Sequence, residues 1–325
     1  MSPTTDPLFV VGCPRSGTTL LAGLLSGLPD VWIGKETNFI PPLYEPDSGS
    51  LHEWGDARLG ALVDAVNSYL ETGRWEARAT VAGARRAWSE TGMDTQTNAY
   101  AGFIRYVWSL DAPPDGEARP IAGDQSPAYV LALPLLEQLF PTARYIHVLR
   151  DPRDVVASIL PLPFWSRSAG VAASDWNECV AGWWAAERRV PPERRCEVRY
   201  EDLVRDPDTT LRQLATTLDL TLPDPEPGSS LSKDRHGLAD LAPHHARLSG
   251  PIDDSSVGRH RRDLTDRDRS LVEAITYAGL VTYGYETGPY RPSPVLQEDV
   301  TLLTRERLRD LRRRAAGRLA RRWPW

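Results

Sequence analysis

A glycine-rich segment near the N-terminus carries the residue types that bind phosphate groups in proteins. The run GCPRSGTT occupies residues 12–19, directly after the apolar residues 8–11. The apolar run is typical of a buried parallel strand, and the leucines that follow the loop recur at helical spacing. A loop that leads into a helix N-terminus offers backbone N–H groups and the positive end of the helix dipole to an anion. The chemistry predicted for this segment is therefore the binding of a phosphate group.

This loop matches the ATP-binding pattern G-x-x-x-x-G-K-[ST] except at its lysine. Gly12 and Gly17 have the required separation, but Thr18 occupies the lysine position. That lysine reaches the β- and γ-phosphates of a nucleoside triphosphate, so a loop without it should have little use for a γ-phosphate. The cation lies inside the loop instead, at Arg15. The alternative is a tight turn without a ligand, which would not require this combination of residues.

One carboxylate follows the second predicted strand. Residues 31–33 suit a short strand, and Glu36 lies just past its end. Ligands of open α/β sheets bind outside the carboxyl ends of the strands, so Glu36 is well placed for chemistry. The alternative is a solvated loop carboxylate, and the spacing alone does not choose between the two.

A third group of polar residues follows the apolar run YIHVL at residues 145–149. Arg150 comes directly after this predicted strand, and Ser158 lies about two turns into the helix that should follow. A nucleoside triphosphatase needs an acidic residue after such a strand to hold Mg²⁺, whereas arginine binds anions. Asp151 stays open as that acid. His147, in mid-strand, is interpreted as a core histidine.

The elements that must position these residues alternate between strand and helix. This order predicts an α/β protein with a central, mostly parallel sheet flanked by helices, in one domain over residues 1–300. Residues 41–118 should form an aromatic-rich helical insertion, and residues 223–262 an irregular, lid-like loop. Further strands are predicted at 120–123 and 195–200, and helices at 55–70, 95–110, 129–140, 175–189, 208–218 and 265–280.

Composition limits the function classes. The chain has 325 residues, 41% of them hydrophobic, and a net charge of −6, which argues against wholesale nucleic-acid binding. Its three cysteines show neither metal-binding nor disulfide-framework spacing. No signal peptide and no apolar run of about 18 residues is found. The sequence therefore predicts a cytoplasmic protein.

The C-terminal segment differs in charge from the rest of the chain. Residues 301–325 contain nine arginines and two acidic residues, with leucines spaced along one face of a predicted helix. A basic amphipathic helix of this kind can lie on an anionic membrane. The alternative, which we favour, is packing of this helix against the acidic body of the protein.

Together these segments resemble the sulfotransferases that use 3′-phosphoadenosine 5′-phosphosulfate (PAPS). The resemblance rests on CPRSGTT at residues 13–19 with Arg150 and Ser158, and it covers roughly residues 8–40, 120–160, 195–220 and 255–285. It implies a P-loop-like sulfotransferase fold in which the first loop holds the 5′-phosphosulfate. Arg150 and Ser158 would hold the 3′-phosphate, and a late loop at 256–262 would close over it. The implied cofactor-binding residues are Pro14, Arg15, Ser16, Gly17, Thr18, Thr19, Arg150, Ser158, Tyr200, Gly258 and Arg259, with Tyr200 near the adenine.

Within that family, residues 14–41 look most like protein-tyrosine sulfotransferases and their bacterial relatives. The resemblance makes Glu36, in the run GKET, the general base, whereas other branches use a histidine. One departure stands out, because many relatives carry lysine where this chain has Gln125 in the run GDQSP. Transfer would then depend more on Arg15 and the loop amides.

The function implied is transfer of the sulfuryl group from PAPS to an acceptor hydroxyl, which leaves the product PAP. Glu36 would remove the acceptor proton, and Arg15 would stabilise charge on the departing phosphate. No metal ion is expected, since arginines meet the charge of the nucleotide. The acceptor is expected to be a hydroxyl on a small molecule, glycan or peptide, with a bacterial specialised metabolite favoured. A nucleotide-binding protein without turnover and a P-loop kinase stay open as alternatives.

Overall fold

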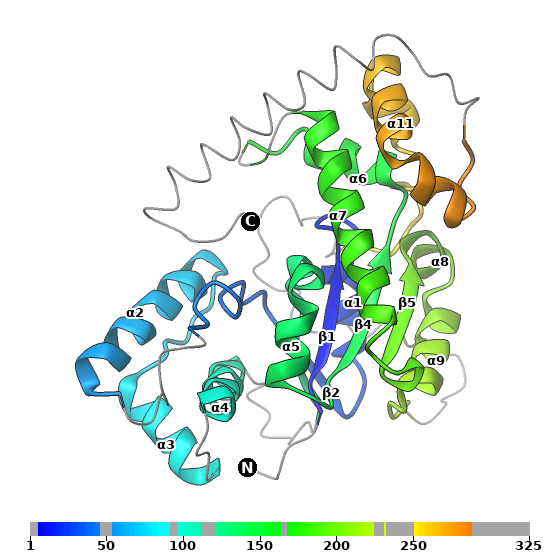
Figure 1. The fold of residues 1–325 in the computed structure, drawn as a ribbon. Helices are drawn as coiled ribbons and strands as arrows, with labels where there is room; N and C mark the ends of the chain where they lie inside the picture. Colours follow the sequence, from blue (N-terminus) through cyan, green and yellow to red (C-terminus); the bar gives the residue numbers. More distant parts are fainter. Residues whose placement is uncertain are drawn as a thin grey trace.

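Five parallel strands form the centre of the part of the chain that the structure describes. The computed structural model describes residues 6–45, 54–91, 96–111, 121–163, 165, 168–223, 231 and 250–287. The strands have the spatial order β2-β3-β1-β4-β5, and every neighbouring pair is parallel (Figure 1). They are β1 (Leu8–Gly12), β2 (Val31–Gly34), β3 (Ile121–Asp124), β4 (Arg144–Leu149) and β5 (Arg195–Arg199). The predicted α/β fold with a parallel sheet is confirmed.

Helices cover both faces of this sheet, and a further group of helices lies to one side of it (Figure 1). The group at the side is the helical insertion, which consists of α2 (Asp56–Thr72), α3 (Val81–Thr91) and α4 (Gln96–Ser109). The remaining α-helices are α1 (Thr18–Leu25), α5 (Leu133–Leu139), α6 (Pro152–Ile159), α7 (Ala169–Glu187), α8 (Tyr200–Arg205), α9 (Pro207–Leu218), α10 (His260–Asp263) and α11 (Asp266–Thr282). The described residues also form the 3-10 helices η2 (Pro127–Ala132) and η3 (Pro192–Arg194).

The central strands bury both of their faces. Phe9 and Val11 of β1 join the hydrophobic cluster that contains side chains of α5, α7 and the insertion, whereas Leu8 and Val10 join the cluster with α1, α8 and α9. Successive side chains of a strand point to opposite faces, so β1 contributes to two cores. This is why β1 appears in the sequence as a continuous apolar run and does not alternate with polar residues.

His147 is a buried residue in the middle of β4. Its side chain is buried, its ring stacks on Trp183 with 4.9 Å between ring centroids, and its Nδ1 lies 2.9 Å from Glu197 Oε2. The interpretation of His147 as a satisfied core histidine is confirmed.

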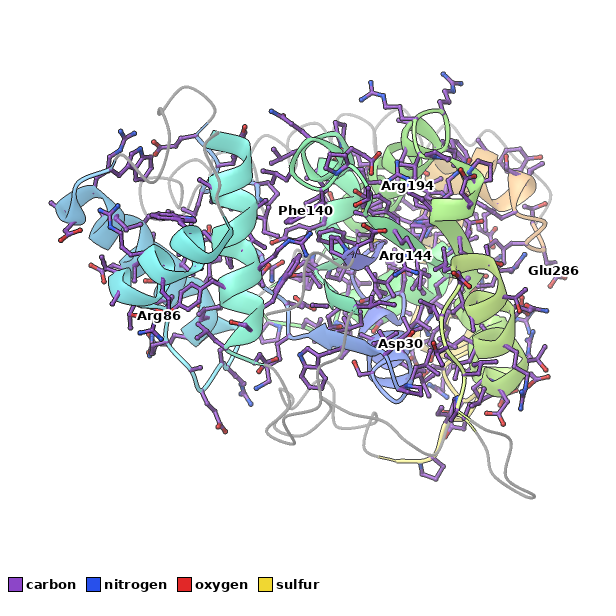
Figure 2. All side chains as sticks on the ribbon, turned by 90° about the horizontal axis from the view of Figure 1, so that it is seen from below. Asp30, Arg86, Phe140, Arg144, Arg194 and Glu286 are labelled. Carbon is purple, nitrogen blue, oxygen red and sulfur yellow. The ribbon has the colours of Figure 1, made fainter. Side chains whose placement is uncertain are left out.

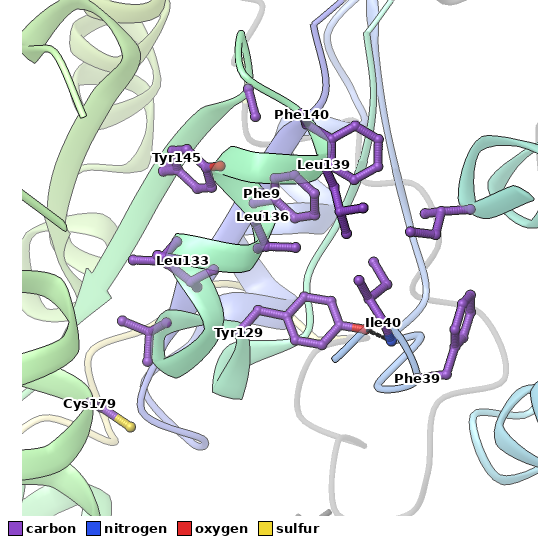
Figure 3. Close-up of a cluster of buried hydrophobic side chains, with 14 of the residues drawn as sticks. Phe9, Phe39, Ile40, Tyr129, Leu133, Leu136, Leu139, Phe140, Tyr145 and Cys179 are labelled. Atoms are coloured by element: carbon purple, nitrogen blue, oxygen red, sulfur yellow. Dashed lines mark hydrogen bonds between the residues drawn. The ribbon is translucent and has the colours of Figure 1, made fainter. Parts of the chain in front are cut away.

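Aromatic side chains attach the insertion to the sheet. Trp108 of α4 packs against Phe9 of β1 and Phe140, with ring centroids 5.7 and 5.5 Å apart, and Phe9 also stacks on Tyr145 of β4. Figure 3 shows Phe9, Phe140 and Tyr145 together in the cluster, and Figure 2 shows Phe140 between the insertion and the sheet. The insertion and the sheet therefore share one hydrophobic core.

Three predicted segments differ in the structure. The helix expected over 129–140 is split into η2 and α5, because Pro134 has no N–H to donate and its ring would clash with the carbonyl of Val130 in a continuous helix. The stretch expected to be irregular over 223–262 ends in the short helix α10 from His260. The insertion also contains α3, which the periodicity did not single out.

Other predictions fall on residues that the structure does not describe. They concern most of the lid-like loop, at 224–230 and 232–249, and the basic tail at 301–325. Among the described residues, no helix combines the length and the apolar composition needed to cross a membrane.

Candidate active site

The five strands bring the candidate site residues into a row at one edge of the sheet. Each strand is followed within three residues by one polar or aromatic side chain of the predicted site. In spatial order these are Glu36 after β2, Gln125 after β3, Arg15 after β1, Arg150 after β4 and Tyr200 after β5. Parallel strands end at a common edge, which is where ligands of such sheets bind. Residues far apart in the sequence thus meet in one place.

Two glycines fix the path of the loop between β1 and α1. A Cβ on Gly12 would lie 2.6 Å from the Val148 carbonyl oxygen, and a Cβ on Gly17 would lie 2.5 Å from the Tyr200 ring. Gly17 also has a left-handed backbone, with φ of 104°. Side chains at these positions would push the loop away from β4 and from Tyr200, so the spacing of the two glycines is explained by close packing.

The N-terminus of α1 is prepared for an anion. No side chain caps it, and no acidic residue lies in its first turn. The first N–H groups of a helix have no partner within the helix, and they carry the positive end of its dipole. Ser16 lies two residues before α1 and is fully buried. Its hydroxyl has no hydrogen-bond partner in the described structure.

Arg15 and Arg150 lie together although 135 positions separate them in the sequence. Arg150 Nη1 donates to the Arg15 carbonyl oxygen at 3.0 Å, and Arg15 Nε donates to Ser158 Oγ at 3.3 Å. The Arg150 guanidinium lies over the Tyr200 ring, 4.1 Å from its centroid, and its buried Nε has no partner among the described residues. Arg15 has a φ of 73°, uncommon for a residue with a side chain. Strain of this kind is concentrated at functional sites.

Burial and like charge act on this arginine pair. Burial, together with the positive charge of Arg150, lowers the pKa of Arg15 below its ordinary value. Arg259, in the late loop, adds positive charge that acts in the same direction. An anion placed among these three guanidinium groups would offset their mutual repulsion, so the site is suited to a phosphate or sulfate group.

Glu36 lies close enough to Arg15 for their charges to interact. Burial raises the pKa of Glu36 above the ordinary glutamate value, and the negative charge of Asp124 adds to this increase. A hydrogen bond from Asn38 Nδ2 to Glu36 Oε2, at 3.1 Å, and the charge of Arg15 act in the opposite direction. A carboxylate with a raised pKa is a stronger base at neutral pH, as a general base requires.

Buried hydrogen bonds hold the backbone that carries Glu36. Thr37 Oγ1 donates to Asp124 Oδ2 at 2.6 Å and lies 2.7 Å from Tyr129 OH. The Tyr129 hydroxyl also accepts from Ile40 N–H at 3.0 Å, and Figure 3 shows this hydrogen bond. Ser126 Oγ accepts from the N–H groups of Thr37 and the residue after it, both at 3.1 Å. The segment after β2 is thereby attached to the end of β3 and to η2.

The late loop lies against the beginning of α6. The backbone carbonyl oxygen of Ser256 accepts a hydrogen bond from Arg150 Nη2 at 2.7 Å. Asp154 accepts from Gly258 N–H at 2.7 Å and from His260 N–H at 2.9 Å. Gly258 has a φ of 71°, which suits glycine.

All of the predicted site residues are described, and the structure brings the five strand-end residues, Ser158, Gly258 and Arg259 to the same edge of the sheet. Gln125 is buried there and its Oε1 has no partner in the described structure. The two histidines that could act as a rival base, His244 and His245, lie outside the described residues. The sequence analysis did not assign a role to several residues that support the site. They are Asn38, Asp124, Ser126, Tyr129 and Asp154. Two of them, Asp124 and Ser126, lie in the recognised run GDQSP.

Asp151 is already engaged, which bears on the kinase alternative. Its carboxylate caps α6 by accepting from Arg153 N–H at 2.9 Å, and it pairs with the Arg153 guanidinium at 2.7 Å. An aspartate held in this way is poorly available to a magnesium ion. Together with the threonine at the lysine position of the loop, this arrangement disfavours a nucleoside triphosphatase.

A polar cavity of about 520 Å³ borders the late loop on another side. Residues of α6, α8 and α10 line it, with Tyr285 and Glu286, and no residue of the loop between β1 and α1 is among them. None of the five strand-end side chains lines the cavity, whereas Asp154 and Gly258 do.

The fold and the site define a P-loop-like α/β protein with paired arginines at its anion-binding edge. Residues 7–224 match the family described as "Sulfotransferase family". Because this match spans more than half of the chain, the protein belongs to the sulfotransferase family. The family resemblance inferred from the loop and from Arg150 is confirmed.

Curated relatives include protein-tyrosine sulfotransferases. Protein-tyrosine sulfotransferase A of Caenorhabditis elegans is 28% identical over 230 residues, which cover 67% of this chain and 50% of that protein. Protein-tyrosine sulfotransferase 1 of Danio rerio is 26% identical over 222 residues, covering 66% of this chain and 53% of that protein. The chain thus spans about half the length of these two relatives.

A solved structure supports the fold assignment. The sulfotransferase domain from the Synechococcus PCC 7002 olefin synthase superposes with a TM-score of 0.56 at 23% identity, covering 89% of this chain and 99% of that one. At this identity, the likeness concerns the fold.

Proposed function

We propose that this protein transfers a sulfuryl group from PAPS to an acceptor hydroxyl. The observation that carries the proposal is the meeting of Arg15, Arg150 and Ser158 at the sheet edge where Glu36 also lies. This arrangement places two arginines and a serine, which can bind an anionic donor, beside a carboxylate, which can act as a base. Membership of the sulfotransferase family supports this use of the site.

The residues present fit the nucleotide. Ser16 Oγ and Arg150 Nε are buried hydrogen-bonding atoms without partners in the described structure, and α1 has no side-chain cap. Buried polar groups are normally satisfied, so these atoms are consistent with a ligand that carries oxygen acceptors. The residues from Pro14 to Thr19 would hold the 5′-phosphosulfate. Arg150, Ser158, Gly258 and Arg259 would hold the 3′-phosphate, with Tyr200 towards the adenine.

The donor, when bound, supplies the sulfuryl group and leaves as PAP. Glu36 accepts the proton of the acceptor hydroxyl as the oxygen of that hydroxyl bonds to sulfur. Arg15 and the N–H groups at the start of α1 stabilise the negative charge on the leaving phosphate, as preorganised donors do. Asn38 orients the Glu36 carboxylate through its hydrogen bond. The burial that raises the pKa of Glu36 increases its basicity.

The acceptor is proposed at the level of chemical class. The names of the curated relatives make a phenolic hydroxyl, such as that of tyrosine in a peptide, the first class to assay. A hydroxyl of a bacterial specialised metabolite is the second class. Most aromatic side chains of the insertion, including Trp88, Tyr100, Phe103 and Trp108, are buried in its core and do not argue for either class. A cytoplasmic location stays a prediction from the sequence.

A second function, nucleotide binding without turnover, is favoured by one observation. Gln125 stands where many relatives have lysine, and it brings no positive charge to the site. Its side-chain carbonyl oxygen is buried and has no partner in the described structure. Binding of PAP with no detectable sulfuryl transfer to any hydroxyl would support this function.

Calorimetry with PAP, ATP and adenosine 5′-phosphosulfate tests the donor. We expect PAP to bind most tightly, because it has both the 5′- and the 3′-phosphate. Transfer of radiolabelled sulfate from PAPS to tyrosine-containing peptides and to phenols then tests turnover. Tighter binding of ATP with Mg²⁺ than of PAP would overturn the proposal.

A further inference from the structure

One buried carboxylate connects the start of α6 to the late loop. Asp154 is 1% exposed, and both of its oxygens accept hydrogen bonds from residues more than 100 positions away. Gly258 N–H donates to Oδ2 at 2.7 Å, His260 N–H donates to Oδ1 at 2.9 Å, and His260 Nδ1 lies 2.7 Å from the same Oδ1. We call these contacts the Asp154 clasp.

The clasp uses features that only an ionised carboxylate supplies. Burial acts to raise the pKa of Asp154, but the hydrogen bonds from His260 and Gly258, together with the positive charge of Arg150, outweigh it, and the pKa lies below the ordinary aspartate value. Both oxygens are acceptors, and hydrogen bonds to a charged acceptor are stronger than neutral ones. An asparagine at this position would turn an NH₂ group towards a backbone N–H or towards the histidine, so at least one contact would be lost.

Polar contacts carry most of the attachment of this loop. The polar cavity described above reaches the loop at Val257, Gly258 and His260, so the loop is not packed against side chains on that side. A Cβ added to Gly258 would meet no atom within 4 Å. Of the loop side chains, Val257 packs against a hydrophobic cluster. Further polar attachments include the hydrogen bond from Arg150 to the Ser256 carbonyl oxygen and the exposed ion pair between Arg261 and Glu286.

The clasp lies between the residues assigned to the 3′-phosphate. Arg150 precedes α6, Asp154 is in its first turn, and Ser158 is one turn further along. Arg259, between the two residues that Asp154 holds, contributes its positive charge to the neighbourhood of Arg15. An ion pair with Asp263 at 2.9 Å orients the Arg259 guanidinium.

We propose that Asp154 is a positioning residue for the 3′-phosphate, which it serves by holding Gly258 and Arg259 across from Arg150 and Ser158. The inference rests on the proposed PAPS-binding function. It predicts a selective effect, since a nucleotide without a 3′-phosphate gains much less from the late loop. Asp154 itself does not touch the nucleotide in this scheme, because its oxygens are occupied by the loop.

Binding calorimetry with Asp154→Asn tests the inference without relying on turnover. We expect the affinity for PAP to fall by roughly 10- to 100-fold, as for loss of hydrogen bonds to a charged group. The affinity for adenosine 5′-phosphosulfate, which lacks the 3′-phosphate, should stay within about twofold, and this also shows that the variant is folded. Hydrogen exchange of the backbone around Gly258 should become faster in the same variant.

Asp206→Asn is the matched control. It makes the same change of charge in a carboxylate that caps α9, where it accepts from Thr209 N–H. Asparagine caps helices as well as aspartate does, so both nucleotide affinities should be unchanged. If Asp154→Asn fails to fold, His260→Ala removes the buried ring and its contact with Asp154 but keeps both backbone contacts, and it should still lower the affinity for PAP selectively, by roughly 3- to 10-fold.

The possible outcomes distinguish a failure of the inference about Asp154 from a failure of the proposed function. A wild-type protein that binds PAP no better than adenosine 5′-phosphosulfate overturns both. A wild-type protein that prefers PAP, with a folded Asp154→Asn or His260→Ala variant that keeps the same preference, overturns the role of Asp154 alone. Equal loss of affinity for both nucleotides in a folded variant also overturns it.

Discussion

At the scale of single residues, Glu36 and Arg150 belong to different parts of the proposed reaction. Glu36 is beside Arg15 and has a raised pKa, as suits proton removal from an acceptor. Arg150 is tied to backbone carbonyls of two loops and keeps a buried Nε that has no partner among the described residues. Substitutions at the two positions should therefore have different signatures in binding and in turnover.

Glu36→Gln should abolish most turnover and leave nucleotide binding intact. The amide keeps the size of the side chain but cannot accept a proton at neutral pH, so kcat should fall by about 10²–10⁴-fold. Affinity for PAP, measured by calorimetry, should change little. Glu71→Gln, on the exposed face of α2, is the control. Near-normal turnover of Glu36→Gln, with loss of turnover in His244→Ala or His245→Ala, would move the base to a histidine.

The same substitution should change the pH dependence of stability. Burial raises the pKa of Glu36 in the folded protein, so the folded state binds more protons than the unfolded state between the two pKa values. Stability contributed by protonated Glu36 is then lost as pH rises through this window. Glu36→Gln cannot ionise, so its Tm should exceed that of the wild type at pH 8 and approach it near pH 4. A Tm difference that is constant across this range would contradict the raised pKa.

Arg150→Ala should weaken PAP binding by about 1.5–3 kcal/mol, the size of a hydrogen bond to a charged group. The loss for adenosine 5′-phosphosulfate should be smaller, because this nucleotide has no 3′-phosphate and is affected only indirectly, through the contacts of Arg150 with the Arg15 carbonyl, the Ser256 carbonyl and the Tyr200 ring. Arg205→Ala, at the end of α8, should leave both affinities unchanged. Equal losses for the two nucleotides in Arg150→Ala would show that Arg150 does not contact the 3′-phosphate.

At the scale of elements, the segment after β2 depends on contacts with β3 and η2. The fully buried Tyr129 hydroxyl makes hydrogen bonds with Thr37 Oγ1 and with Ile40 N–H. Figure 3 shows the second of these. Tyr100 OH donates to the Ile40 carbonyl oxygen at 2.9 Å from the insertion. Three elements thus fix the backbone next to Glu36.

Tyr129→Phe should lower both stability and kcat. Removing the hydroxyl leaves the Ile40 N–H buried without its acceptor, which costs about 1–3 kcal/mol. Urea denaturation should show this loss, and kcat should fall because the backbone of Glu36 is less well fixed. Tyr277→Phe, on the exposed side of α11, should change stability by less than about 0.5 kcal/mol. A stable Tyr129→Phe variant would mean that another group satisfies Ile40.

At the scale of the whole molecule, the insertion and the sheet are joined through one aromatic cluster. Trp108 is 2% exposed and contacts Phe9 and Phe140, and Phe9 in turn stacks on Tyr145 of β4. Its indole N–H also lies 3.4 Å from Asp124 Oδ2, at the edge of the candidate site. Packing of the insertion and the arrangement of the site are therefore linked.

Trp108→Ala should destabilise the protein by about 3–5 kcal/mol, the usual cost of such a truncation in a core. Because the two parts share this core, unfolding in denaturant should remain a single transition when followed by tryptophan fluorescence and by far-ultraviolet circular dichroism. Phe103→Leu, within the insertion, keeps most of the buried volume and should cost less. Separate transitions for the two probes in the wild type would show that the insertion unfolds independently.

The amino-acid sequence was enough to predict the loop, the parallel strands and the strand-end positions of Arg15, Glu36 and Arg150. These features depend on local spacing: glycines at close approaches, apolar runs buried on both faces, and polar residues directly after them. Only the tertiary structure decided that Arg150 holds the Arg15 carbonyl and that Asp154 holds the late loop. Those contacts join residues more than 100 positions apart, and the packing of the sheet, which no local periodicity encodes, brings them within hydrogen-bonding distance.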